Sequence, residues 1–174
     1  MTLIITPKAC FKQAPIEQGK KLWGPSVQLY TLRTQHNWGI GDFGDLKQLV
    51  ADISSRGGDF VGLNPIHSLF PANPEGASPY SPSSRRWLNI LYIDVSSVPE
   101  FALSAEAQQT VGSAEFQQRL QKAREAHWVN YTEVSELKMS ILPLLFAEFK
   151  TRHLDKNSDR AQAVSYTHLT LPTT

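Results

Sequence analysis

Two hydrophobic patterns follow one another in the first third of the chain. Residues 26–33 (S-V-Q-L-Y-T-L-R) alternate between apolar and polar, with Val27 and Leu29 on one face, and this alternation predicts a strand. The next apolar positions recur at the spacing of one helix face, at Leu46, Leu49, Val50 and Ile53. Asp42 or Asp45 can cap this helix at its N-terminus.

A glycine pair ends this helix, and a second strand follows it. Gly57-Gly58 is typical of a helix C-terminus, and the apolar run at residues 60–63 predicts the next strand. Strand, helix and strand in this order form a unit whose two strands run parallel. A further strand or extended segment is predicted at residues 90–95. The pattern therefore predicts an α/β fold.

Two longer helices are predicted after residue 110. The first begins near a Ser113 cap and carries a stripe of four residues, Phe116, Leu120, Ala123 and His127. The second begins at a Thr132 cap and carries a stripe of five, Val134, Leu137, Ile141, Leu145 and Phe149. Pro143 lies inside the second helix and is expected to kink or split it.

The same pattern divides the chain into three parts. Residues 1–22 hold one short strand candidate, at residues 3–6, followed by irregular sequence, so we interpret them as the end of an upstream domain and a linker. Residues 23–163 carry the strand and helix patterns. Residues 164–174 change abruptly to a segment with no acidic residue, lysine or arginine and no helical period, and we interpret them as a non-native tail.

Composition and charge exclude several classes of protein. The 174 residues are 41% hydrophobic and 19% charged with a net charge of +1, which favours neither nucleic acid nor a membrane surface as a partner. Cys10 is the only cysteine, so no internal disulfide can form, and the histidines lack the spacing of a zinc site. No apolar run is long enough to span a membrane. These features indicate a cytoplasmic protein.

The long loop after the second strand is the candidate binding region. Pro65 ends that strand near Asn64, and loops of this length tend to be functional. In a parallel α/β fold the loops that follow the strands gather on one face. Aromatic rings, hydroxyls and an amide that suit a sugar fall there, at Tyr30, Trp38, Phe70, Ser78, Tyr80, Ser81, Trp87 and Asn89. His67 could hydrogen bond a substrate hydroxyl, take part in acid–base chemistry, or only tie down backbone.

Three other features are weighed at this face. Residues 39–44 spell G-x-G-x-x-G, but they do not follow the strand directly, and Asp59 lies at the start of the second strand, where a ribose-binding acid would lie at its end. Hydrolysis or transfer of glycosides requires a pair of carboxylates about 5–5.5 Å apart for retention. Asp42 and Asp45 are better explained as helix caps, and the orientation of Glu75 is open, so no convincing pair is found. Residues 85–86 (R-R) are interpreted as a solvated or salt-bridged pair, too small a patch to indicate phosphate binding.

Several of these segments together resemble a known family. Residues 26–33 (S-V-Q-L-Y-T-L-R), 37–46 (N-W-G-I-G-D-F-G-D-L), 62–67 (G-L-N-P-I-H) and 78–94, which contains S-P-Y-S-P-S-S-R, are similar to the N-terminal half-barrel of amylomaltases. These are the 4-alpha-glucanotransferases of glycoside hydrolase family 77. The resemblance covers about residues 3–160 and is greatest to the longer bacterial form.

The resemblance implies a fold, a reaction and site residues. It implies the first part of a (β/α)8 TIM barrel with inserted helices, truncated here, and transfer of α-1,4-glucan segments between maltodextrins by a retaining mechanism without metal or organic cofactor. Ser78 and Tyr80 match the residues that line the family's sugar site, and Asn64, His67 and Asn89 match positions on the same face. Trp38 joins them as a candidate from the aromatic set.

The family's catalytic residues are not matched. The nucleophile aspartate, the acid/base glutamate and a second aspartate belong to later strands of the barrel, so we expect this chain to lack the catalytic carboxylates and to be inactive by itself. A non-catalytic carbohydrate-binding module and a nucleotide-binding oxidoreductase piece remain the alternative classes. Turnover of maltotriose by the extended chain would exclude the first, and absence of NAD(H) binding the second.

Overall fold

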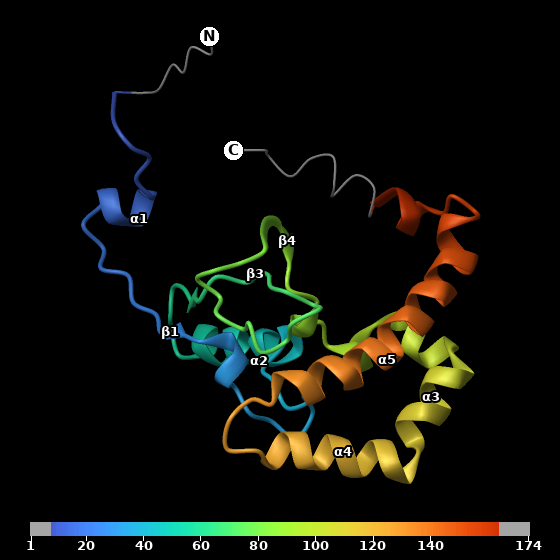
Figure 1. The fold of residues 1–174 in the computed structure, drawn as a ribbon. Helices are drawn as coiled ribbons and strands as arrows, with labels where there is room; N and C mark the ends of the chain where they lie inside the picture. The colour runs from blue at the N-terminus through green and yellow to red at the C-terminus, as the bar shows by residue number, and fades with distance from the viewer. Residues whose placement is uncertain (1–7, 164–174) are drawn as a thin grey trace.

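The computed structural model describes residues 8–163, which form a mixed arrangement of helices and short strands (Figure 1). The predicted strand at residues 3–6 and the predicted tail at residues 164–174 lie outside the described residues. The elements in chain order are α1 (Ala14–Glu17), β1 (Ser26–Val27), η1 (Leu29–Thr31), α2 (Phe43–Ser55), β2 (Gly62–Leu63), β3 (His67–Ser68), β4 (Ser84–Leu88), η2 (Ile90–Tyr92), η3 (Val95–Ser97), η4 (Pro99–Leu103), α3 (Ala105–Gly112), α4 (Ala114–Glu125), α5 (Tyr131–Phe149) and the π-helical η5 (Lys150–Leu154).

The predicted strand–helix–strand unit is confirmed. β1 and β2 pair in parallel, with Ser26 opposite Gly62, and α2 connects them. The first strand is shorter than predicted, because the chain turns into η1 at Leu29. There the Asn64 side-chain oxygen accepts the Leu29 N–H at 2.7 Å, so this group is paired without a strand ladder. The same bond joins the carboxyl ends of the two strands.

Asp42 caps α2, as one of the two alternatives predicted. Its carboxylate accepts the backbone N–H groups of Gly44 at 2.9 Å and Asp45 at 3.3 Å, and the Asp45 carboxylate accepts the Asp42 N–H at 3.0 Å. This reciprocal pattern is a capping box. At the other end Gly57 adopts a φ of +77°, a left-handed conformation that residues with a side chain rarely take, so the predicted glycine stop is confirmed.

The strand predicted at residues 90–95 is wrong. β3 and β4 pair antiparallel and form a hairpin, and β4 ends before that segment. Residues 90–97 instead wind into η2 and η3, because side chains cap each turn: Asn89 Oδ1 accepts the Leu91 N–H at 3.0 Å and Asp94 Oδ1 accepts the Ser97 N–H at 3.3 Å. Local side-chain bonds of this kind compete with strand pairing.

The helical half follows the prediction with corrections at the ends. Ser113 caps α4 by accepting the Phe116 N–H at 3.2 Å, but His127 lies beyond the helix and is exposed. Asn130, and not Thr132, caps α5, through a 2.9 Å bond from the Glu133 N–H. α5 continues through Pro143, so the predicted split does not occur.

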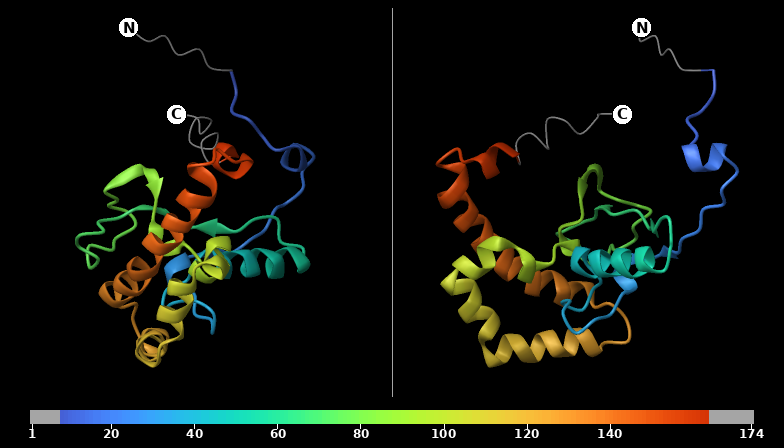
Figure 2. Two further views of the ribbon diagram at one scale, coloured as in Figure 1. Left: turned by 90° about the vertical axis from the view of Figure 1, so that its right-hand side faces the viewer. Right: turned by 180° about the vertical axis from the view of Figure 1, so that it is seen from behind.

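α5 connects the strand side of the molecule, which holds β1–β4 and α2, with the helical half, which holds α3 and α4. Figures 1 and 2 show it running between the hairpin side and the α3–α4 side. Toward the helices it packs in a helical core made by Trp38, Val95, Ala107, Phe116, Leu120, Ala123, Leu137, Ile141 and Leu145. Toward the strands it packs in a strand-side core made by Leu29, Ile40, Leu91, Tyr92 and Val134. The predicted α5 stripe therefore serves both cores. No helix within residues 8–163 has the length and apolar character to cross a bilayer.

A buried lysine on α5 links this helix to two other segments, the start of α2 and residues 91–93. Lys138 is fully buried, and its Nζ donates to the backbone carbonyls of Leu91 and Ile93, each at 2.7 Å. The Asp42 carboxylate lies 3.6 Å from the same nitrogen. Burial lowers the pKa of Lys138 to about 8 and raises the pKa of Asp42 above its ordinary value. The Asp42 carboxylate thus caps α2 and is also the counter-ion of Lys138 on α5.

The titration of Lys138 predicts a rise in stability at mildly alkaline pH. Its pKa is about 8 in the folded protein, whereas a solvent-exposed lysine has a pKa of 10.5. Between these values the unfolded chain binds more protons, so the free energy of unfolding increases with pH, by on the order of 2 kcal/mol from about pH 8 to about pH 10. Above about pH 10 it should fall, because burial raises the pKa of Tyr131 to about 12 and the unfolded chain then loses that proton first. Urea unfolding across this range measures both slopes, and a flat profile up to about pH 10 would contradict the first.

Candidate functional site

The hairpin and the loop that links its strands enclose a cavity of about 280 Å³, here called the hairpin cavity. Its lining residues are Pro65, His67, Pro79, Tyr80, Pro82 and Arg85. The three prolines restrict the backbone of the walls. The Tyr80 side chain is 67% exposed, so its ring is available to stack on a ligand. A flat ring beside an imidazole and a guanidinium can meet both the apolar face and the hydroxyls of a sugar.

His67 lines this cavity from β3, opposite Leu88 of β4. Its Nδ1 atom is buried and has no hydrogen-bond partner within residues 8–163. A buried ring nitrogen without a partner is uncommon and is costly unless a ligand or solvent completes it. One of the roles left open for His67 was to tie down the backbone. Within residues 8–163 no backbone group bonds to Nδ1, so this atom does not support that role.

The loop before β4 carries the remaining surface candidates. Ser78 is exposed, and its carbonyl accepts the Ser81 N–H at 3.2 Å in the turn that presents Tyr80. Two further rings of the same hairpin are exposed, Phe70 at 45% and Trp87 at 59%. Of the aromatic set predicted to face a ligand, Phe70, Tyr80 and Trp87 are thus exposed on the hairpin and its loop, whereas Tyr30 packs against the strand-side core.

Asn64 and Asn89 lie inside the protein, 7% and 5% exposed. The Asn64 amide is occupied: besides accepting from Leu29, it donates to the Pro65 carbonyl at 2.7 Å and to the Tyr92 hydroxyl at 3.3 Å. Asn89 caps η2, and its own N–H donates to the Ile66 carbonyl at 3.0 Å. Both side chains hold the backbone on which the hairpin is built, and their contact with a sugar stays a prediction.

Trp38 lies in the helical core, and its contact with a sugar stays a prediction. Its side chain is 2% exposed and meets the Phe116 ring edge-on, with centroids 5.3 Å apart, in the helical core. The following Gly39 has a φ of +82°, and a Cβ at this position would lie 2.8 Å from the Ala123 Cβ on α4. The glycines of the G-x-G-x-x-G segment therefore allow close packing of Trp38 and its turn, and the dinucleotide interpretation gains no support.

The carboxylates near the site already have structural partners. Asp42 and Asp45 form the capping box of α2, and Asp45 also accepts from the Thr34 hydroxyl at 2.7 Å and the Asn37 amide at 2.9 Å. The orientation of Glu75, open from sequence, is toward α5, where its carboxylate accepts two hydrogen bonds from Thr132. No group of three or more metal-binding side chains occurs within residues 8–163.

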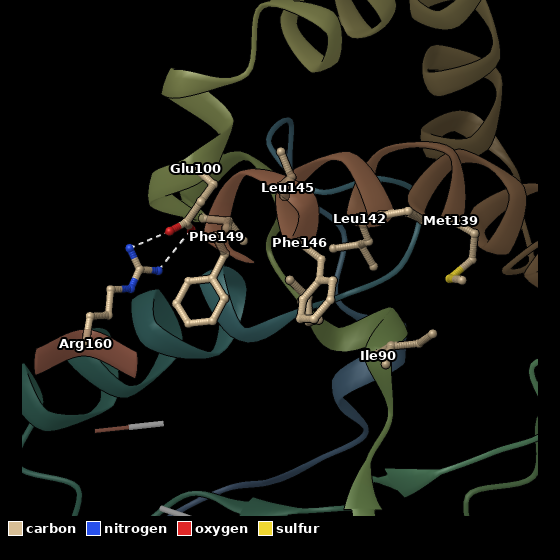
Figure 3. Close-up of a pocket in the computed structure, with 11 residues that line it drawn as sticks. Ile90, Glu100, Met139, Leu142, Leu145, Phe146, Phe149 and Arg160 are labelled. Carbon is tan, nitrogen blue, oxygen red and sulfur yellow. Dashed lines mark hydrogen bonds and ion pairs between the residues drawn. The ribbon is translucent and has the colours of Figure 1, made fainter. Parts of the chain in front are cut away.

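Two of the larger cavities, each of about 540 Å³, suit a sugar less well. Figure 3 shows the first, an apolar groove along α5 with Met139, Leu142, Phe146 and Phe149 on its walls. The Glu100–Arg160 ion pair, 2.7 Å long, closes one end of this groove. The second cavity lies at the start of α2 and is polar, but none of its lining residues is tyrosine, tryptophan or phenylalanine. In the first of these cavities the charged groups, Glu100 and Arg160, are paired with each other. The hairpin cavity instead places the exposed ring of Tyr80 beside His67 and Arg85.

A scan against protein-family models decides which family this is. The family described as 4-alpha-glucanotransferase matches residues 27–168, which include the whole hairpin cavity. The chain belongs to the 4-alpha-glucanotransferase family. The family resemblance noted on the sequence motifs is thereby confirmed.

Individual 4-alpha-glucanotransferases support this assignment. The enzyme of that name from Haemophilus influenzae is 46% identical over 148 residues, which is 85% of this chain and 21% of that protein. The one from Chlamydia pneumoniae is 27% identical over 154 residues, 85% of this chain and 27% of that protein. The crystal structure of amylomaltase from Corynebacterium glutamicum superposes with a TM-score of 0.63 at 32% identity, covering 71% of this chain and 18% of that one. The chain spans about a fifth to a quarter of the length of these relatives.

Sequence reasoning missed Arg85 at this family's candidate site. The sequence suggests only a solvated or salt-bridged pair with Arg86, because it predicts the next strand after residue 89. The structure places Arg85 in β4, where it lines the hairpin cavity with His67 and Tyr80. The alternation of residues 84–88 (S-R-R-W-L) is too weak to predict that strand. The signal that could have located Arg85 is its place at the end of the S-P-Y-S-P-S-S-R segment on which the family resemblance rests.

Proposed function

We propose that this chain provides part of the glucan-binding face of a 4-alpha-glucanotransferase that transfers α-1,4-glucan segments between maltodextrins. The observation that carries the proposal is the hairpin cavity, in which the family's S-P-Y motif presents an exposed Tyr80 beside His67. We infer further that residues 23–163 are the first part of a (β/α)8 barrel with inserted helices, for which the parallel β1–α2–β2 unit is the supporting feature. Residues 1–22 are assigned to an upstream domain and linker.

The proposed chemistry is a retaining double displacement. A glucan segment is held covalently on an aspartate and then passed to the 4-hydroxyl of an acceptor sugar. The nucleophile and the acid would come from outside this chain, since Asp42, Asp45 and Glu75 are already engaged as caps or with α5. Within the chain, Tyr80 would stack on a glucose ring, and His67 and Ser78 would hydrogen bond its hydroxyls. No metal or organic cofactor is required.

Extension of the chain tests the function. With the rest of a relative's sequence joined after residue 163, we expect release of glucose and formation of longer oligosaccharides from maltotriose. Binding of maltotriose without turnover by that extended protein would favour a carbohydrate-binding module instead. Saturable NAD(H) binding by the 174-residue chain would favour the oxidoreductase alternative.

Replacing Tyr80 with alanine should weaken binding of maltoheptaose to the 174-residue chain by about fivefold to tenfold. A stacked ring contributes about 1 kcal/mol beyond its buried area, which corresponds to a factor of this size. Tyr80→Phe should keep most of the affinity, because it keeps the ring. Trp128→Ala, which removes a ring that is 79% exposed on the loop between α4 and α5, is the matched control and should bind as the unmodified chain does. Calorimetric titration measures all three, and equal affinity of Tyr80→Ala and the unmodified chain would remove Tyr80 from the site.

A further inference from the structure

The loop that carries Ser78 and Tyr80 is tied to α5 by one carboxylate. Glu75 Oε1 accepts the backbone N–H of Thr132 at 3.1 Å and the Thr132 hydroxyl at 2.6 Å, across 57 residues of sequence. Thr132 is the second residue of α5, where backbone N–H groups have no partner within the helix. A negative charge is also favoured at this end of a helix by the helix dipole. Glu75 is therefore well matched to the position it occupies.

The other hydrogen bonds that hold this loop are local. Within residues 69–83, Asn73 donates to the Phe70 carbonyl, Gly76 to the Asn73 carbonyl, and Ser83 back to the Ser68 carbonyl on β3. Four prolines, at positions 71, 74, 79 and 82, remove further backbone donors. The bonds from Thr132 thus connect this loop to the helices, and they fall three residues before Ser78 and five before Tyr80.

α5 does not depend on Glu75 for its own cap. Asn130 already accepts the Glu133 N–H at 2.9 Å, and the first turn of α5 is further held by Val134, which is fully buried in the strand-side core. Loss of the Glu75 carboxylate therefore leaves the helix start fixed and releases the loop. The Glu75–Thr132 contact therefore positions the loop and is not needed to form the helix.

We propose that Glu75 is a positioning residue for glucan binding: by holding residues 69–83 on the first turn of α5, it fixes Tyr80 over the hairpin cavity. The inference rests on the proposed function of that cavity. A loop that is already ordered loses less conformational entropy when the ligand binds, so its affinity is higher. The contact also makes the helical half of the protein part of the sugar site, although none of its residues lines the cavity.

Paired substitutions in the 174-residue chain test this role. Glu75→Ala and Thr132→Val each remove bonds, whereas Glu75→Gln keeps an oxygen acceptor and Thr132→Ser keeps the hydroxyl. We expect Glu75→Ala to bind maltoheptaose about tenfold more weakly, a factor of the size that the net loss of one or two ordinary hydrogen bonds gives. Glu75→Gln and Thr132→Ser should recover most of the affinity. The double variant Glu75→Ala/Thr132→Val should bind no more weakly than Glu75→Ala, because the two groups act through one contact.

Hydrogen exchange supplies a readout that a purely structural role would not give. In Glu75→Ala, exchange should accelerate in residues 69–83 while the protection of α5 is retained. Glu115→Ala removes an exposed carboxylate from the first turn of α4 and is the matched control for loss of charge at a helix start. It should change neither the affinity nor the exchange of the loop.

The outcomes separate this inference from the proposed function. Failure of the unmodified chain to bind maltoheptaose would overturn the function of the cavity and this inference with it. Binding by the unmodified chain and by Glu75→Ala with equal affinity would overturn only the role of Glu75. Equal weakening by Glu75→Ala and Glu75→Gln would also overturn it, since the negative charge and not the bonded contact would then be responsible.

Discussion

Replacing Lys138 with methionine is expected to lower the free energy of unfolding by about 1–3 kcal/mol, the cost of leaving buried polar groups without a hydrogen-bond partner. Methionine preserves the apolar stem, so the loss comes from the hydrogen bonds of the amino group. Without it the carbonyls of Leu91 and Ile93 lose their shared donor, and the Asp42 carboxylate, 3% exposed, loses its neighbouring nitrogen. Urea unfolding at about pH 7 measures the change.

Two further variants define the cause of this loss. Lys122→Met removes an exposed lysine from α4 and should change the free energy of unfolding by less than about 0.5 kcal/mol. Adding Asp42→Asn to Lys138→Met should recover part of the stability, because asparagine still caps α2 and leaves no uncompensated charge. A loss below about 1 kcal/mol in Lys138→Met would mean that the buried pair is not the link between α5 and α2.

Replacing Trp38 with alanine is expected to cost about 3–5 kcal/mol, as truncation of a large buried aromatic does. The indole fills the helical core against Phe116 and is 2% exposed, so its removal leaves a cavity between α4 and the turn that ends at Asp42. Trp128→Ala removes a ring that is 79% exposed and should stay within about 0.5 kcal/mol of the unmodified chain. Chemical denaturation monitored by far-UV circular dichroism measures both.

The more conservative Trp38→Phe decides between a core role and a sugar contact. A smaller ring can remain in the core, so the chain should stay folded and bind maltoheptaose as the unmodified protein does. If Trp38→Phe instead weakened binding as much as Tyr80→Ala, the result would support the predicted contact of Trp38 with the sugar.

The sequence by itself determined those features whose partners lie within about four residues. Asp42 and Ser113 are correctly predicted as caps, because a cap accepts an N–H two or three residues later. The parallel strand–helix–strand unit follows from the change of hydrophobic period. The α5 stripe is correct too, and it contains a missed signal: Lys138 follows Val134 by four residues and precedes Ile141 by three, so the spacing alone places it on the buried face.

Tertiary structure decided which polar and aromatic residues lie exposed on the hairpin and which lie inside the protein. Asn64 lies at a strand end, as a sugar contact would, yet its amide is used by Leu29, 35 residues away. Thr132 has the residue type of a cap, but its hydroxyl and N–H bind Glu75. Such partners come together only when the chain folds, and a buried polar group must take whichever partner the packing supplies. Local periodicity therefore predicted the elements, and long-range pairing assigned the roles of their side chains.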